Sequence, residues 1–279
     1  MPTQLLATGV ELYYEVHGSG EPIVLLPATG FAGNVWNEPY QLPGLAESNQ
    51  VIIFDPRGCG RSTRYEGVYT IEQMGQDVIA LLDHLSIEAA HLVGHSMGGR
   101  IALSIALDAP RRVTSMIMAA SGSGPAARDG DDCVAGLPFR LVDSLVELGF
   151  DKYLEEEILD SATYFSDEYR ATHPKEVALF YEIVAAQHAP RDCYIRLCQA
   201  RHNFEATHRL GDVRVPTLVL VGDLDTVGSN HVSQSEALKR IPGSQYRMLA
   251  GQSHGFFWER PDDTNALIKE WVDAHSRTS

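Results

Sequence analysis

The sequence predicts an α/β fold in which a mostly parallel sheet is covered by helices on both faces. Two observations predict it: short apolar runs recur along the 279-residue chain, and patterns with helical spacing lie between most of them. A strand followed by a helix and a further strand implies a crossover connection, which joins parallel neighbours in a sheet. Both faces of such a sheet are buried, so its strands are expected to be short and largely apolar.

The individual elements follow from apolar runs, turn-forming residues and periodicity. Val10–Val16 alternates between apolar and polar residues and is expected at an edge of the sheet. The remaining strands are expected at Ile23–Leu26, Val51–Phe54, His91–Val93, Val113–Ala119, Thr217–Val221 and Tyr246–Leu249. The helices between them are expected at Tyr69–Leu85, Arg100–Leu107, Gln234–Arg240 and Asp262–His275.

The alternation stops between Pro125 and Asp212, where no convincing strand is visible. These 88 residues contain helical patterns at Pro138–Phe150, Pro174–Gln187 and Asp192–Phe204, and the sheet resumes at Val215. We therefore expect residues 1–124 and 213–279 to form one α/β core, with 125–212 inserted as a helical cap. The inserted segment holds 17 acidic and nine basic side chains, so it carries just over half of the net charge of −15.

The composition excludes several classes of function. The chain has 37 acidic and 22 basic side chains, and this balance argues against a general affinity for nucleic acid or anionic lipid. No apolar run approaches the roughly 20 residues of a membrane span, and the first residues lack a secretory signal pattern. No metal-ligand spacing is visible among the cysteines, which are Cys59, Cys133, Cys193 and Cys198. We expect a cytoplasmic protein, because the cysteines suggest a reducing compartment.

The strongest local motif is Gly94-His95-Ser96-Met97-Gly98, which follows the strand at His91–Val93 and precedes a helical pattern. This is a G-x-S-x-G nucleophile elbow in the strand, turn and helix context that it requires. The sharp turn strains the serine backbone, and side chains two residues away on either side would collide. The hydroxyl is presented at the carboxyl edge of the sheet, where a helix N-terminus favours an anion. Ser96 is therefore the candidate nucleophile.

A serine hydroxyl is a weak nucleophile near neutral pH, so it needs a base, and the base needs an orienting acid. Two later loops offer these groups, each directly after a predicted strand. The strand Thr217–Val221 leads into Asp223 and Asp225, and the strand Tyr246–Leu249 leads into His254. Serine, acid and histidine occur in the chain order of a G-x-S-x-G hydrolase. His254 is the candidate base, while Asp223 and Asp225 compete for the role of the acid.

Together these motifs resemble those of the α/β-hydrolase superfamily, of the capped esterase, lactonase and carbon–carbon hydrolase type. The resemblance spans residues 13–274, although the segment 125–212 carries no family motif. The matching elements are the loop Asp55–Ser62, the elbow, Gly222-x-x-Asp225, and His254 followed by Glu259-Arg260-Pro261. The resemblance implies Ser96 as nucleophile, Asp225 as orienting acid and His254 as general base. Some relatives carry the acid after the strand that matches Val113–Ala119, but no carboxylate follows it here.

The chain departs from the family pattern after the strand at Ile23–Leu26. Relatives usually carry His-Gly there, whereas this chain reads Pro27-Ala28-Thr29-Gly30-Phe31. The spacing to Trp36 places Thr29 at the backbone N–H donor position, and a shift of the loop by two residues would place Phe31 there instead. Met97 is the other donor, because it follows the nucleophile. An oxyanion hole needs two N–H groups about 3 Å from the oxygen, so the missing histidine is compatible with activity.

Other polar residues near these motifs are expected to be structural. His95 is expected to pack beneath the elbow rather than act as a second base, and Asp55 and Arg57 to brace a loop. Cys59 is expected to be inert.

The resemblance implies hydrolysis of a small or medium carboxylic ester or lactone through an acyl-enzyme on Ser96, with no metal and no organic cofactor. Serine at the elbow excludes epoxide hydrolases and haloalkane dehalogenases of this fold, which place aspartate there. A carbon–carbon hydrolase of dienoic ring-cleavage products stays open, and a pocket arginine would favour it; the arginines considered are Arg100, Arg191 and Arg196. The non-enzymatic alternative is a ligand receptor on the same scaffold. The acidic cap favours a neutral, partly apolar small molecule, because it slows the approach of anions. A monomer and a homo-oligomer both remain open.

Overall fold

The computed structural model describes residues 3–124, 133–134, 137–160, 163–225 and 231–276. An eight-stranded sheet in the order β1-β2-β4-β3-β5-β6-β9-β10 forms its centre. The strands are β1 (Thr3–Leu5), β2 (Glu11–His17), β3 (Glu21–Leu26), β4 (Asn49–Phe54), β5 (Ala90–His95), β6 (Val113–Ala119), β9 (Thr217–Gly222) and β10 (Gln245–Leu249). Neighbours from β4 to β10 are parallel, whereas β1 with β2 and β2 with β4 are antiparallel. The predicted α/β class with a mostly parallel sheet is confirmed.

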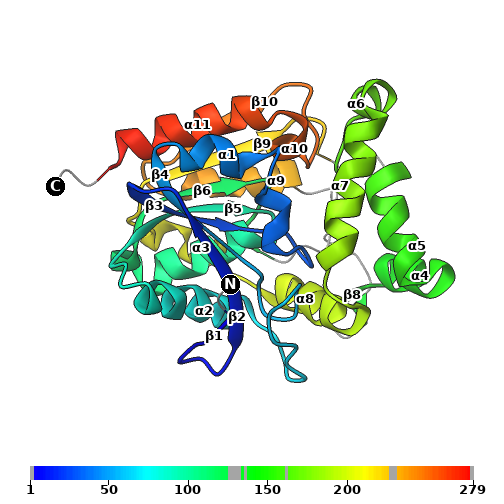
Figure 1. Ribbon diagram of the computed structural model, residues 1–279, viewed down its shortest axis with the longest axis horizontal. Coiled ribbons are helices and arrows are strands. Elements are labelled where there is room, and N and C mark those ends of the chain that lie inside the picture. The colour runs from blue at the N-terminus through cyan, green and yellow to red at the C-terminus, as the bar shows by residue number, and fades with distance from the viewer. Residues whose placement is uncertain (1–2, 125–132, 135–136, 161–162, 226–230, 277–279) are drawn as a thin grey trace.

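Helices cover both faces of this sheet (Figure 1). On one face lie α1 (Gln41–Ala46) and α11 (Pro261–Ala274), and on the other α2 (Ile71–His84) and α3 (Met97–Asp108). The strand β3 supplies both interfaces, because Ile23 and Leu25 belong to the apolar core under α1 and α11, whereas Val24 and Leu26 belong to the core under α2 and α3. Burial on both faces explains why the central strands are continuous apolar runs. The remaining helices of this part are η1 (Gly33–Trp36), η2 (Pro110–Arg112), α9 (His231–Ala237), η5 (Leu238–Arg240) and α10 (Phe256–Glu259).

The helix α2 shows how local sequence sets an element boundary. Thr70 caps its N-terminus: the Thr70 hydroxyl accepts from the Gln73 amide at 3.1 Å, and the Gln73 side chain accepts from the Thr70 amide at 3.2 Å. This reciprocal pair satisfies two N–H groups that the first helical turn leaves unpaired. The helix therefore begins at Ile71, two residues after the start that periodicity alone predicted.

One expectation about the sheet edge was wrong. The strand β2 is not at the edge, because β1 pairs with it antiparallel, with Gln4 opposite Leu12. The strand β1 has only three residues and alternating exposure, so it carries no apolar run that a sequence pattern would show. The helix α1 was also not predicted, because it contains Pro43 and Gly44, which both oppose helix formation.

The chain between β6 and β9 is mainly helical. Its helices are α4 (Phe139–Leu148), α5 (Phe150–Glu155), the π-helical turn η3 (Glu156–Asp160), α6 (Asp167–Thr172), α7 (Pro174–Gln187), α8 (Arg191–Asn203) and η4 (Thr207–Asp212). The helices α4 to α7 stand together at one end of the sheet (Figure 1). The helix predicted over Pro138–Phe150 is divided at Gly149, whose φ of 76° is incompatible with a continuous α-helix. The expectation of no strand was wrong in one detail, because β7 (Cys133–Val134) pairs antiparallel with β8 (Leu137–Pro138).

Within the described residues, no helix is both long and apolar enough to cross a membrane. The same part of the chain contains no group of three or more His, Cys, Asp or Glu side chains arranged to hold a metal ion.

Candidate active site

Ser96 lies at a strained turn between β5 and α3. Its backbone has φ 53° and ψ −112°, in a region that L-residues rarely occupy. A Cβ atom at Gly94 would lie 2.4 Å from the Gly98 carbonyl, and one at Gly98 would lie 2.1 Å from the Leu26 oxygen. Both glycines of the motif are therefore sterically required, as the sequence predicted. The close approach of Gly98 to Leu26 also sets the start of α3 directly against the end of β3.

Two hydrogen bonds from the neighbouring strand region hold the turn in this conformation. The Ser96 amide donates to the Ala119 carbonyl at 2.8 Å, and the Ser121 hydroxyl donates to the Ser96 carbonyl at 2.6 Å. Ser121 was not identified from the sequence as a residue near the site. A buried serine two residues beyond a strand gives no pattern that would distinguish it from other polar loop residues.

His254 and Asp225 form a buried pair beside the elbow. The Nδ1–H of His254 donates to Oδ2 of Asp225 at 2.9 Å, and both side chains are almost fully buried. His95, the residue before Ser96, lies with its ring 4.6 Å from the His254 ring, and its Nε2–H donates to the His254 carbonyl at 2.9 Å. With Nδ1 protonated and bound to a carboxylate, Nε2 is the basic nitrogen of His254. The geometry therefore brings together the side chains of Asp225, His254 and His95, and His95 directly precedes Ser96.

Asp223, the competing acid, has a different partner. Its Oδ1 accepts from the Gly251 amide at 2.7 Å, which ties the loop after β9 to the loop after β10. Asp223 is exposed, whereas Asp225 is 6% exposed. Between the two aspartates, the structure thus pairs Asp225 with His254 and gives Asp223 a contact that holds a turn.

The backbone N–H groups of Thr29 and Met97 are the candidate oxyanion donors. Met97 is the first residue of α3, and neither its N–H nor that of Thr29 donates to another group among the described residues. The Phe31 amide instead donates to the Ala28 carbonyl at 3.2 Å, which closes a turn. The geometry favours Thr29 over Phe31 as the second donor, because the Phe31 N–H is occupied within its own loop.

Arg201, at the end of α8, reaches the same loop and was not singled out from the sequence. Its Nη1 donates to the Thr29 hydroxyl at 3.3 Å. Tyr164 lies nearby: its ring stacks on Phe31 at a centroid distance of 5.4 Å and meets the His254 ring edge-on at 5.6 Å. Burial raises the pKa of Tyr164 well above its ordinary value, so the hydroxyl is neutral near pH 7. No sequence signal marks Arg201, because it reaches the site through the packing of a helix between β6 and β9 on the sheet.

Glu259 connects the histidine loop to the inserted segment. Its Oε1 accepts from the Ser166 amide at 2.6 Å, and its Oε2 accepts from the Ser253 amide at 3.2 Å. The Ser253 hydroxyl donates to the Tyr164 carbonyl, and a Cβ atom at Gly255 would lie 2.0 Å from that same carbonyl oxygen. The backbone around residues 164–166 is thus held directly against the loop that carries His254.

The residues expected to be structural have structural contacts. Asp55 accepts from the Gly33 amide at 2.9 Å and from Nε of Arg61 at 2.8 Å. Arg57 forms a buried, two-point ion pair with Asp77 through Nε at 2.7 Å and Nη2 at 2.8 Å. Burial raises the pKa of the Cys59 thiol well above its usual value, which disfavours the reactive thiolate.

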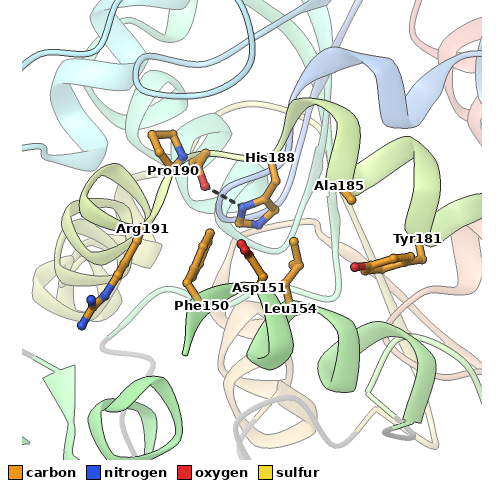
Figure 2. Close-up of a pocket in the computed structure, with 9 residues that line it drawn as sticks. Phe150, Asp151, Leu154, Tyr181, Ala185, His188, Pro190 and Arg191 are labelled. Carbon is orange, nitrogen blue, oxygen red and sulfur yellow. Dashed lines mark hydrogen bonds between the residues drawn. The ribbon is translucent and has the colours of Figure 1, made fainter. Parts of the chain in front are cut away.

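A cavity of about 630 Å³ lies among the inserted helices, lined mainly by α5, α7 and the connection to α8. Figure 2 shows the His188 ring projecting from that connection towards Phe150 and Asp151 of α5. On its other side His188 approaches the Thr29 loop, since a Cβ atom at Gly30 would lie 2.6 Å from its ring. Burial lowers the pKa of His188 to about 4, so the ring is neutral near pH 7. His188 therefore separates this cavity from the loop after β3. Arg191 lines the cavity, and Arg196 is an ion-paired surface residue.

The comparisons with known proteins agree with the fold. A family model described as the alpha/beta hydrolase fold matches residues 21–261. The chain belongs to the α/β-hydrolase family. Among curated relatives of this α/β hydrolase, a candidate carbamate hydrolase, RutD, from Azorhizobium caulinodans is 29% identical over 92% of the chain and 93% of the relative.

Two solved structures illustrate the similarity of the whole fold. Est816, described as an N-acyl homoserine lactone degrading enzyme, has a TM-score of 0.78 and 29% identity, and the alignment covers 95% of this chain and 98% of Est816. The enol-lactonase from Burkholderia xenovorans LB400 has a TM-score of 0.84 and 25% identity, with 98% of this chain and 100% of the enol-lactonase covered. The expected membership of the α/β hydrolases is thus confirmed, and relatives that are named as hydrolases align over nearly the whole chain.

Proposed function

We propose that this α/β hydrolase cleaves a small or medium carboxylic ester or lactone through an acyl-enzyme on Ser96. The observation that carries the proposal is the buried Asp225–His254 pair, at 2.9 Å, beside the strained elbow that presents Ser96. The relatives named above support it, because lactones and carbamates are both attacked at a carbonyl carbon.

In the proposed mechanism, Nε2 of His254 accepts the Ser96 proton as the hydroxyl oxygen attacks the substrate carbonyl. Asp225 holds the imidazole through Nδ1 and stabilises the imidazolium that forms. The oxyanion receives hydrogen bonds from the N–H groups of Met97 and Thr29, each worth about 3–4 kcal/mol in the transition state. His254 then protonates the leaving oxygen, and water, activated by the same nitrogen, hydrolyses the acyl-enzyme. The proposed reaction uses no metal or organic cofactor.

The proposal assigns residues 1–124 and 213–279 to the catalytic core and 125–212 to a cap that shapes the substrate site. Contacts of the inserted residues support this assignment, since Tyr164 meets His254 and Arg201 meets Thr29. We further propose a cytoplasmic location, which is supported by Cys59, Cys193 and Cys198 being free thiols.

The first test is active-site labelling with a fluorophosphonate. We expect the probe to modify Ser96 alone, and the Ser96→Ala variant to remain unlabelled. Ser104→Ala, a buried serine on the same helix α3, is the matched control and should be labelled as the wild-type protein is. A folded wild-type protein that does not react would refute the nucleophile assignment and leave a ligand receptor as the better interpretation.

The second test is a hydrolysis screen with Ser96→Ala as the blank. The panel contains p-nitrophenyl esters, five- and six-membered lactones, an alkyl carbamate and a dienoate of the ring-cleavage type. We expect turnover of esters or lactones. Turnover of the dienoate without the esters would replace the proposal with carbon–carbon hydrolysis, and turnover of the carbamate alone would replace it with carbamate hydrolysis.

A further inference from the structure

Arg201 is a cation at the candidate site with most of its donors unused. A guanidinium carries five N–H donors, yet the only hydrogen bonds of Arg201 among the described residues are to the Thr29 hydroxyl at 3.3 Å and the His202 ring at 3.4 Å. Its Nε is buried and has no hydrogen-bond partner in the described ranges. Within the same part of the chain no carboxylate forms an ion pair with it.

The groups that surround Arg201 do not neutralise it. They are one thiol and three phenols, Cys198, Tyr153, Tyr164 and Tyr194. Burial raises the pKa of each of them above its ordinary value, so all four are uncharged near pH 7. The carboxylate of Glu157 lies in the same region and acts electrostatically on Tyr153 and Tyr164.

Arg100 adds a second positive charge to the buried region around Arg201. It lies on α3 four residues after Ser96 and is completely buried, and within the described part of the chain its Nε and Nη1 have no hydrogen-bond partner. Its Nη2 donates to the Gln234 side chain and to the Gly124 carbonyl, which are both uncharged. Burial and the charge of Arg201 lower its pKa to about 9, so it is still protonated near pH 7. Among the residues that the structure describes, neither arginine therefore has an anionic partner.

A buried guanidinium is unfavourable unless an anion pairs with it. Its planar fork matches a carboxylate, which accepts two parallel hydrogen bonds from it. Within this protein, Arg57 binds Asp77 in just this way. Arg201 has the same capacity, and its contact with Thr29 places it beside the backbone that would hold the oxyanion.

We propose that Arg201 binds a free carboxylate of the substrate, so that the preferred substrates are half-esters of dicarboxylic acids or lactones that carry a carboxylate. This inference rests on the proposed hydrolase function and refines it. Because a pocket arginine also favours the carbon–carbon hydrolase alternative, the dienoate of the substrate panel distinguishes the two. It also revises the expectation of a neutral substrate, which depended on the acidic cap. Charges on exposed helix faces are screened within about 8–10 Å at physiological salt, whereas Arg201 acts at hydrogen-bond distance in a partly desolvated site.

The test compares two substrates that differ only in charge: the mono-p-nitrophenyl ester of adipic acid and its neutral carboxamide analogue. The measured quantity is the ratio of their kcat/KM values, corrected for spontaneous hydrolysis with Ser96→Ala. We expect the wild-type protein to prefer the charged ester, and Arg201→Met to lower the ratio about 10- to 100-fold, as for lost hydrogen bonds to a charged group. Arg201→Lys keeps the charge but loses the fork, so we expect an intermediate ratio. Arg196→Met, an ion-paired surface arginine on the same helix, is the matched control and should keep the wild-type ratio.

The ratio separates binding of the carboxylate from support of the loop after β3, because a merely structural role of Arg201 would affect both esters equally. A wild-type preference for the neutral ester, or a ratio within twofold of wild type in both Arg201 variants, would overturn the inference while ester hydrolysis still stands. If Arg201→Met does not fold, the kcat/KM ratios of the wild-type protein and of Arg201→Lys are measured at low and high salt instead. A preference for the neutral ester, or equal ratios in the two proteins, would then overturn the inference. Absence of turnover of either ester by the wild-type protein, without labelling of Ser96, would instead refute the proposed function.

Discussion

Replacement of Gly98 by alanine tests whether the spacing between α3 and β3 controls the oxyanion hole. The added Cβ would lie 2.1 Å from the Leu26 oxygen and 2.6 Å from its carbonyl carbon, whereas real Cβ contacts below 3.0 Å essentially do not occur. The clash is between the first turn of α3 and the backbone of Leu26, which cannot move aside as a flexible side chain could. The start of α3 and the end of β3 must therefore separate by about 1 Å. Because Met97 begins α3 and the Thr29 loop follows β3, the two candidate N–H donors move apart.

Separation of this size is costly for catalysis. Loss of one oxyanion donor lowers kcat about 10²–10³-fold, and misplacement by about 1 Å costs about 10²-fold. We therefore expect Gly98→Ala to lower kcat for a p-nitrophenyl ester at least about 100-fold, together with about 1–3 kcal/mol of unfolding free energy from overpacking. Steady-state kinetics, fluorophosphonate labelling rates and urea denaturation measure these effects.

Gly211→Ala is the matched control, because a Cβ atom there meets nothing within 4 Å and the residue lies in η4, away from the elbow. It should keep wild-type kinetics and stability. A folded Gly98→Ala protein with kcat within threefold of wild type would refute the steric reasoning, and with it the assignment of Met97 and Thr29 as paired donors.

Three further predictions concern the acid, a buried histidine and a buried ion pair. Asp225→Asn should lower kcat by about 10⁴-fold, as loss of the orienting carboxylate does in serine proteases, whereas Asp223→Asn should keep kcat within a few-fold; parallel kinetics distinguish them. The pKa of His188 is lowered from 6.5 to about 4 by burial, so the unfolded chain binds more protons between these values. Stability is therefore retained above pH 6.5 and falls as the pH drops towards 4, by up to about 3 kcal/mol. Urea denaturation at pH 7, 5.5 and 4.5 should show that the free energy of unfolding depends less on pH in His188→Gln than in the wild-type protein. An equal dependence in both proteins would contradict the lowered pKa of His188. Arg57→Met should cost about 3–5 kcal/mol of unfolding free energy because it leaves the Asp77 carboxylate buried and unpaired; the double variant with Asp77→Leu should recover part of the loss, and a fully additive double variant would argue against that explanation.

The central sheet could be predicted because its strands are buried on both faces. β6 occupies Val113–Ala119, the range that the apolar run predicts, and β3, β4 and β9 extend the predicted runs by no more than two residues. Elements held by tertiary contacts gave no such signal. The strand β1 depends on pairing with β2, and α1 forms in spite of Pro43 and Gly44.

The candidate site was predictable in its sequence-local parts and not in its tertiary ones. Ser96 is marked by the elbow, and His254 by a loop directly after a strand. Asp223 and Asp225 follow the same strand two residues apart, so only the turn geometry decides which carboxylate reaches His254. Arg201 left no trace in the sequence, because its place depends on how α8 packs over the loop after β3. The proposed role of Arg201 in substrate binding, like the roles of the other site residues, stays a prediction.

The contacts of Glu259 have a consequence for exchange of the inserted segment between related enzymes. The chain leaves the sheet at β6 and returns in β9, its neighbour, so insertions of different length fit there with a closure entropy that rises only slowly. The restriction lies elsewhere: a transplanted segment must present an N–H to the Glu259 carboxylate and a carbonyl to the Ser253 hydroxyl, as residues 166 and 164 do. It must also pass close over Gly255, where a side chain is not tolerated. Exchange of this segment is therefore constrained at these three points and not at the ends of the insert.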